Sequence, residues 1–278
     1  MIPKIIHYCW FGRGEMPELT LKCLASWQKY LPEYEIMLWN EDNFNVYSYK
    51  YTADAYKERK FAFVADVCRL HALSEIGGLY LDTDVEFIKA LPDEFLNDTA
   101  FTAFEDCLVS AGVIGSVKNG EWIKNLLSFY KDKDFYRADG SLDINPITEM
   151  ITDFLGREKG VLANNTYQKI ADYCTIYPSE YFYPKSWKTL KMNITPNTYC
   201  IHHFAGSWID HNYTLLGKIA NVILGKKRAA YWSARYRKIR AKKMVTIPLS
   251  KLSNLQLFAA LHLQVFDIAA QSPFVLVG

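Results

Sequence analysis

The sequence predicts an α/β protein with a mainly parallel central sheet, helices on its faces and a basic helical extension at its C-terminal end. Three observations support this prediction. Strand and helix patterns alternate over the first 90 residues, an apolar run ends in the acidic pair Asp82 and Asp84, and the basic residues concentrate in one segment. Alternating strands and helices favour a parallel sheet, which binds its ligands at the carboxyl ends of the strands.

The period of the apolar residues assigns the elements of the first half of the chain. In chain order, we expect a strand over 3–9, a helix over 18–31, a strand over 34–39 and a helix over 60–76. Gly77 and Gly78 end that helix, because glycine readily takes the left-handed conformation that closes helices. The apolar run 79–81 then forms the strand that leads into Asp82.

The second half of the chain has a looser pattern. Its expected elements are strands over 100–104 and 112–116, a helix over 121–131 and a last strand over 199–203. Asn145 as a cap and Pro146 in the first turn predict one further helix. Residues 177–187 are rich in aromatic residues and proline, which indicates an ordered loop over a site.

Composition and charge divide the chain into three segments. Of its 278 residues, 50% are hydrophobic and 22% are charged, which disfavours a disordered chain and permits a large core. The net charge of +2 hides an asymmetry, because residues 215–245 contain ten Lys and Arg and no acidic residue. We therefore expect a globular domain over 1–214, a basic amphipathic helical segment over 215–245 and an apolar tail of unknown role over 246–278.

The basic segment 215–245 mixes lysine and arginine with Tyr231, Trp232 and Tyr236. This mixture is typical of a helix that docks on an anionic membrane surface, with its rings at the level of the headgroups. A solvated helix is the plain alternative, and nucleic acid is disfavoured because no base-reading module accompanies the patch. For the tail 246–278, the sequence is compatible with either an interfacial helix or a docking segment.

The cysteines and the N-terminal residues indicate the compartment. Six cysteines are scattered without a CxxC pair or zinc-binding spacing, which is typical of reduced, buried thiols. The first residues lack the order of a signal peptide, and no apolar run reaches membrane-spanning length. We expect a cytoplasmic protein, peripheral on the inner face of the plasma membrane.

Asp82 and Asp84 are the most informative residues of the chain. In an extended chain, residues two apart project to the same side, so both carboxylates can face one small hard cation. Such a pair alone also occurs in helix caps and salt bridges. On the preceding helix, Asp66 and Arg69 either form a plain intrahelical ion pair or lie at the sheet edge, where they bind hydroxyls and phosphate.

Four blocks of sequence, taken in order, resemble a known family. The blocks are residues 2–12, 65–69, 77–84 and 202–208. They resemble the DxD-containing sugar transferases, which include fungal initiating mannosyltransferases, animal galactosyl- and N-acetylglucosaminyltransferases and bacterial capsule-synthesis enzymes. More distantly, the chain is similar to the glucosylating domains of clostridial toxins. The resemblance covers about residues 1–210.

This resemblance implies a GT-A-type, single Rossmann-like domain that uses Mn²⁺ or Mg²⁺. It implies that Asp84 binds the cation directly, while Asp82 contacts the ribose or the sugar and reaches the cation through water. His203, five residues before Trp208, is the expected second ligand, because a neutral imidazole suits manganese. His202 then points to the opposite face of the strand and is structural.

The resemblance also assigns residues to a nucleotide-sugar donor. These are Trp10, Asp66, Arg69, Tyr80, Asp82, Ser207 and Trp208. Trp10 follows the first strand and is expected to stack on the base, a core tryptophan being the alternative. Around Ser207, the alternative is a plain turn after a strand.

One position departs from the family and leaves the donor sugar open. Relatives often carry an asparagine near Ser110 and Ala111, where this chain has none. Glu105 and Asp106, at the end of an expected strand, are candidates for contacts to the sugar or the acceptor.

The activity implied is a metal-dependent, retaining transfer of a hexose or N-acetylhexosamine, with Arg69, Asp82 and Asp84 as the catalytic residues and no protein nucleophile. The donor is expected to be a UDP-linked sugar. The acceptor is expected to be a lipid-linked glycan that is used in capsule or surface polysaccharide synthesis. A non-catalytic nucleotide-sugar-binding or scaffold protein is the alternative. A haloacid-dehalogenase-like phosphatase is disfavoured, because Glu86 stands where that chemistry needs Thr or Ser.

Overall fold

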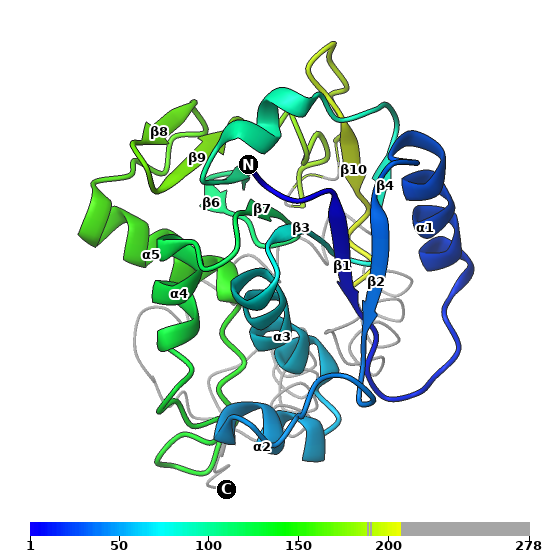
Figure 1. Cartoon of the computed structure of the whole chain (residues 1–278). Helices are drawn as coiled ribbons and strands as arrows, with labels where there is room; N and C mark the ends of the chain where they lie inside the picture. Colours follow the sequence, from blue (N-terminus) through cyan, green and yellow to red (C-terminus); the bar gives the residue numbers. More distant parts are fainter. Residues whose placement is uncertain (188, 190, 207–278) are drawn as a thin grey trace, which may run out of the picture. The chain divides into compact units, whose positions relative to one another are not determined.

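The computed structural model describes residues 1–206 except 188 and 190, and it confirms the α/β class (Figure 1). Ser207, Trp208, the basic segment 215–245 and the tail 246–278 lie outside the described residues, so the expectations about them stay predictions. Among the described helices, none is long and apolar enough to cross a membrane.

The central sheet is mixed in its pairing but has one dominant strand direction. Its strands, in spatial order, are β2 (Glu35–Trp39), β1 (Ile5–Cys9), β3 (Gly78–Leu81), β7 (Val113–Ser116), β5 (Ala100–Glu105), β9 (Cys174–Tyr177) and β8 (Gln168–Ile170), with β6 (Leu108–Val109) on β5. β1 is parallel to β2 and β3, β7 is antiparallel to β3 and β5, and β9 is parallel to β5. Hence β2, β1, β3, β5 and β9 all run in one direction, as the alternation of elements predicted.

A small second sheet joins distant parts of the chain. Strand β4 (Val85–Phe87) follows the acid pair and is antiparallel to β10 (Cys200–His202), with His202 opposite Val85. The indole N–H of Trp27 donates to the Val85 carbonyl oxygen at 2.7 Å, and the Phe87 N–H donates to Ser26 Oγ at 2.9 Å. These bonds fix β4, and through it β10, to the first helix.

The helices follow the expected order with two differences. They are α1 (Glu18–Tyr30), α2 (Lys50–Lys57), α3 (Phe61–Glu75), the short 3₁₀ turn η1 (Asp93–Asn97), α4 (Glu121–Ser128) and α5 (Ile147–Lys159). The sequence pattern did not single out α2. The prediction that Asn145 caps α5 is wrong: Pro146 occupies the cap position without a side-chain bond, and Asn145 Oδ1 accepts from Arg137 at 3.5 Å instead.

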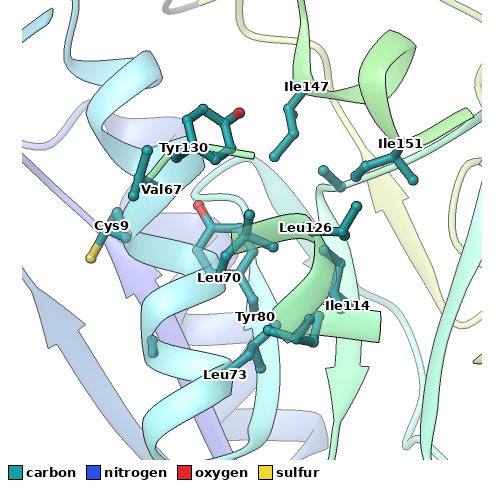
Figure 2. Packing of buried hydrophobic residues seen from close by; sticks show 14 of the residues in the cluster. Cys9, Val67, Leu70, Leu73, Tyr80, Ile114, Leu126, Tyr130, Ile147 and Ile151 are labelled. Atoms are coloured by element: carbon teal, nitrogen blue, oxygen red, sulfur yellow. The ribbon is translucent and has the colours of Figure 1, made fainter. Parts of the chain in front are cut away.

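Helix α3 is buried on most of its surface. In Figure 2, Val67 and Leu70 of α3 lie in one cluster with Ile114 of β7, Leu126 of α4 and Ile151 of α5. The helix contacts β1, β3, β7 and α4. A helix enclosed in this way must also bury its polar residues, which here include Asp66 and Arg69.

The junction between α3 and β3 is fixed by a buried histidine and two glycines. His7 is fully buried; its Nε2 lies 2.7 Å from the Gly77 carbonyl oxygen, and its Nδ1 accepts from the Trp39 indole at 3.0 Å. Nε2 therefore carries the proton and donates it to Gly77. Gly78 has φ 116°, and a Cβ there would lie 2.5 Å from the Ile5 carbonyl oxygen. Glycine at this position, the first residue of β3, lets the strand lie against β1.

The environment of His7 predicts an acid-sensitive contribution to stability. Burial lowers the pKa of His7 below its ordinary 6.5, although the bond to Gly77 opposes this. The unfolded chain therefore takes up this proton first, so the stabilisation is complete above pH 6.5 and is lost as the pH falls below it. We expect the difference in Tm between the wild type and His7→Gln to narrow from about pH 8 to about pH 5. A difference that is constant across this range would contradict the assignment.

Candidate metal and donor site

The two acids converge because the chain turns after β3. The Val85 N–H donates to the Asp82 carbonyl oxygen at 3.0 Å, and the Asp82 N–H donates to the Gly112 carbonyl oxygen at 2.8 Å. The expectation of an extended Asp82-Thr83-Asp84 segment is therefore wrong in its geometry. One ligand atom each of Asp82, Asp84 and His202 still lies within 4.8 Å of the others.

The imidazole beside the acids belongs to His202, which corrects the expectation for His203. His202 Nε2 lies 3.1 Å from Asp84 Oδ1, whereas His203 Nε2 lies 2.7 Å from Glu86 Oε2. Neighbouring residues of a strand do face opposite sides, as expected, but pairing with β4 decides which side is which. His202 is opposite Val85 and shares its buried face, while His203 shares the outer face with Glu86.

Asp84 and His202 each shift the pKa of the other. Burial would raise the pKa of Asp84, but the charge and hydrogen bond of His202, together with the Ala205 N–H at 2.8 Å, lower it to about 2. Burial would lower the pKa of His202, but Asp84 and Glu105 raise it to about 10. Without a cation, the imidazole therefore holds a proton at neutral pH.

These three residues fit a divalent cation. Two carboxylates and one imidazole supply hard oxygen atoms and a nitrogen, a donor set that suits Mn²⁺ and can also serve Mg²⁺. In the cation-free protein, the proton of His202 supplies the positive charge that Asp84 faces. A cation bound by Asp82, Asp84 and His202 would supply that charge instead, with the imidazole neutral.

A buried arginine lies directly behind the acid pair. Arg69 donates to Asp66 Oδ1 at 2.7 Å and to the Ala111 carbonyl oxygen at 2.8 Å, and one of its nitrogens lies 3.3 Å from Asp82 Oδ1. Its guanidinium lies 4.5 Å from the centre of the Tyr80 ring, whose hydroxyl donates to Asp82 Oδ1 at 2.9 Å. The intrahelical ion pair, one of the two alternatives above, is therefore present beside the acid pair, and the binding of hydroxyls and phosphate stays a prediction.

Asp66 is a buried acidic residue with a raised pKa. Burial raises the pKa of Asp66 to about 6, with Asp82 acting in the same direction and Arg69 against it. Asp66 therefore lies close to the boundary between an ionised acceptor and a protonated donor of hydrogen bonds.

Trp10 lies at the same edge of the sheet. The pair His7↔Tyr80 sets the register of β1 and β3, so Trp10, just after β1, comes close to the level of Asp82. Its side chain is partly exposed, and the indole N–H donates to the Gly14 carbonyl oxygen at 2.7 Å. A partly exposed indole held in this way does not match the core alternative.

The structure adds Gly112, which the motifs did not single out, and shows how Glu105, Asp106 and Ser110 are held. A Cβ on Gly112 would lie 2.9 Å from Asp82 Oδ2 and 3.4 Å from the Tyr183 hydroxyl, so glycine leaves the space that Asp82 occupies. Ser110 Oγ donates to Glu105 Oε2 at 2.9 Å, while Asp106 accepts from Ser186 at 3.3 Å. Only the pairing of distant strands reveals these contacts.

Comparison with known proteins agrees with this site. Residues 17–102, which include α3 and the acid pair, match the family described as "Glycosyltransferase sugar-binding region containing DXD motif". The resemblance to the DxD sugar transferases is confirmed for this segment.

Two curated relatives share part of the chain. Inositol phosphoceramide mannosyltransferase 3 of Schizosaccharomyces pombe is 34% identical over 88 residues, which is 30% of this chain and 24% of that protein. Subversion of eukaryotic traffic protein A of Legionella pneumophila is 26% identical over 121 residues, 34% of this chain and 18% of that protein. The chain thus spans about a quarter or less of the length of these relatives.

Solved glycosyltransferase structures give partial superpositions. The PaToxG glycosyltransferase matches with a TM-score of 0.43 and 18% identity, over 56% of this chain and 69% of that one. A glycosyltransferase involved in glycosylating the major capsid of PBCV-1 matches with a TM-score of 0.39 and 13% identity, over 74% of this chain and 95% of that one.

The correction at His202 leads to a direct test. His202→Ala should weaken Mn²⁺ binding by more than about tenfold, because it removes a donor beside Asp84. His203→Ala is the matched control and should leave the affinity unchanged, since its side chain faces Glu86. Isothermal titration calorimetry with Mn²⁺ alone measures both. The reverse ranking of the two variants would restore the original assignment.

Gly112 supplies a second test of the same site. Gly112→Ala should weaken Mn²⁺ binding about tenfold, because the new methyl group displaces the Asp82 carboxylate. The control is Gly156→Ala in α5, where a Cβ would meet nothing closer than the Val161 carbonyl oxygen at 3.6 Å. Equal affinities in both variants would show that Asp82 does not need its present position.

Proposed function

We propose that this chain is a metal-dependent glycosyltransferase that moves a hexose or N-acetylhexosamine from a nucleotide sugar, UDP-linked, to a glycan acceptor. The observation that carries the proposal is the convergence of Asp82, Asp84 and His202 beside the buried Arg69. This cluster lies where β3 ends, which is where open α/β sheets bind their ligands. The fungal relative is named a mannosyltransferase, which supports a hexose as the transferred group.

Trp10 and the pair of Arg69 and Asp66 would hold the donor. The partly exposed indole of Trp10 offers a flat apolar surface for a nucleobase at little cost in conformational entropy. Asp66 is an acceptor for sugar hydroxyls, and Arg69 holds its carboxylate in place. We also propose that Ser207 and Trp208 contact the diphosphate of the donor.

Preorganised charge would account for the transfer step. When bound, a divalent cation supplies Lewis-acid stabilisation of charge that develops on a departing diphosphate. Arg69 adds a fixed positive charge in a buried setting, where it needs no reorganisation during the reaction. For a retaining transfer we name no protein nucleophile, since the leaving phosphate oxygen can take the proton of the acceptor.

The acceptor and the location belong to the same proposal. We infer a lipid-linked glycan acceptor, in capsule or surface polysaccharide synthesis, reached from the cytoplasmic side. Docking through the basic segment 215–245 on anionic lipid would bring the site to such an acceptor. The support for this part is the charge and aromatic content of that segment.

A non-catalytic nucleotide-sugar-binding protein is the second candidate. It would need the same donor contacts but no activating cation. Hydrolysis of a nucleotide sugar that depends on Mn²⁺ distinguishes the two, because a binding protein leaves the donor intact.

Asp84→Asn tests the proposed activity. A screen of UDP-galactose, UDP-glucose and UDP-N-acetyl sugars, by Mn²⁺-dependent hydrolysis and thermal stabilisation, first identifies the donor. Asp84→Asn should then lower the hydrolysis rate by about 100-fold or more, since the cation contributes several kcal/mol to the barrier.

The matched control for this test is Asp132→Asn, an exposed residue outside the site. It should retain the wild-type rate. Full activity in Asp84→Asn, or intact donor after incubation of the wild type with every sugar and Mn²⁺, would refute the proposed function.

A further inference from the structure

His202 has one ring nitrogen without a partner. Its Nε2 faces Asp84, but its Nδ1 is buried and has no hydrogen-bond partner within the described part of the chain. A buried polar group without a hydrogen bond costs free energy. The site is therefore incomplete on the side of His202 that faces away from Asp84.

Glu105 lies on that open side. Its Oε2 is 3.8 Å from His202 Nδ1, beyond hydrogen-bond distance but within reach of a small side-chain rotation. Glu105 is the last residue of β5, and Ser110 Oγ donates to the same oxygen at 2.9 Å. The carboxylate is thus held near the imidazole by the residue that follows β6.

The ring of His202 cannot easily turn to find another partner. The Phe204 ring has its centre 4.3 Å away, and the Tyr183 ring lies edge-on at 5.6 Å. The side chain of His202 is only 12% exposed, so water has little access to it. Within residues 1–206, Glu105 is consequently the group placed to give Nδ1 a bond by a shift of its side chain.

When a cation binds, Nδ1 still needs this bond, because it then carries the only proton of the ring. An imidazole that ligates a cation through Nε2 is neutral and carries its proton on Nδ1. Histidine ligands usually donate that second N–H to a carboxylate or carbonyl oxygen, which fixes the tautomer and the ring orientation. In the part of the chain that the structure describes, Glu105 is such a group on the side of Nδ1.

We propose that Glu105 is a positioning residue that accepts the Nδ1 proton of His202 when the imidazole ligates the cation. The order of contacts is Ser110 to Glu105, Glu105 to His202, and His202 to the cation site shared with Asp84. This inference rests on the proposed metal site and deepens it. It replaces the expectation that Glu105 contacts the sugar or the acceptor.

Metal binding without any donor tests this role. Glu105→Gln keeps the size of the side chain but removes the carboxylate charge, so Mn²⁺ should bind about tenfold more weakly by calorimetry. Ser110→Ala should weaken binding in the same direction and to a smaller extent. The matched control is Glu121→Gln, an exposed residue of α4, which should not change the affinity.

Nuclear magnetic resonance of ¹⁵N-labelled histidine adds a readout that a structural role would not move. With diamagnetic Mg²⁺ bound, wild-type His202 should show a protonated Nδ1, and Glu105→Gln should shift that signal or mix the tautomers. An unchanged Mn²⁺ affinity together with an unchanged Nδ1 signal would overturn the inference.

The outcomes separate this inference from the proposed function. If the wild type binds Mn²⁺ and Glu105→Gln matches it both in affinity and in the Nδ1 signal, the inference fails and the metal site stands. If the wild type binds no Mn²⁺ or Mg²⁺, the metal site and with it the inference fail. Should Glu105→Gln unfold, Ser110→Ala decides by the same two measurements, and wild-type values there would reject the role of Glu105.

Discussion

The enclosed guanidinium of Arg69 is the constraint on which the site depends. A buried charge is tolerated only when it is paired and hydrogen-bonded, because removal from water costs several kcal/mol. Arg69 meets this condition through Asp66 on its own helix, Asp82 after β3 and the Ala111 carbonyl oxygen before β7. One side chain thereby ties three separate segments together and aims Asp82 at the cation site.

Local sequence signals were sufficient for the elements that carry this site. Apolar periodicity placed α3 and β3, and Gly77 marked the end of the helix, because these features depend on neighbours in the chain. The prediction that Asn145 caps α5 was wrong because a cap needs a favourable side-chain geometry, and here Pro146 occupies the cap position. Strand β9 was missed because its residues precede an aromatic segment that was interpreted as loop.

Long-range pairing determined what the sequence could not. Alternation in β10 predicts that His202 and His203 face opposite sides, yet only the partner strand β4 decides which one meets Asp84. Gly112 reaches the site through the link to β7, and no local pattern marks it, while the end of the strand marked Glu105 but not its place beside His202. The spacing of Asp82 and Asp84 predicted that both carboxylates face one site, but a turn rather than an extended strand brings them together.

The isolation of β10 from the central sheet has a thermodynamic consequence. This strand pairs with β4 in a two-stranded ladder, apart from the larger sheet. Such a short ladder can separate locally at a lower free energy than global unfolding. Separation would withdraw His202 and leave both carboxylates in place, so cation occupancy and ladder closure are linked equilibria. An ion that prefers the closed ladder stabilises it, and whatever loosens the ladder speeds release of the ion.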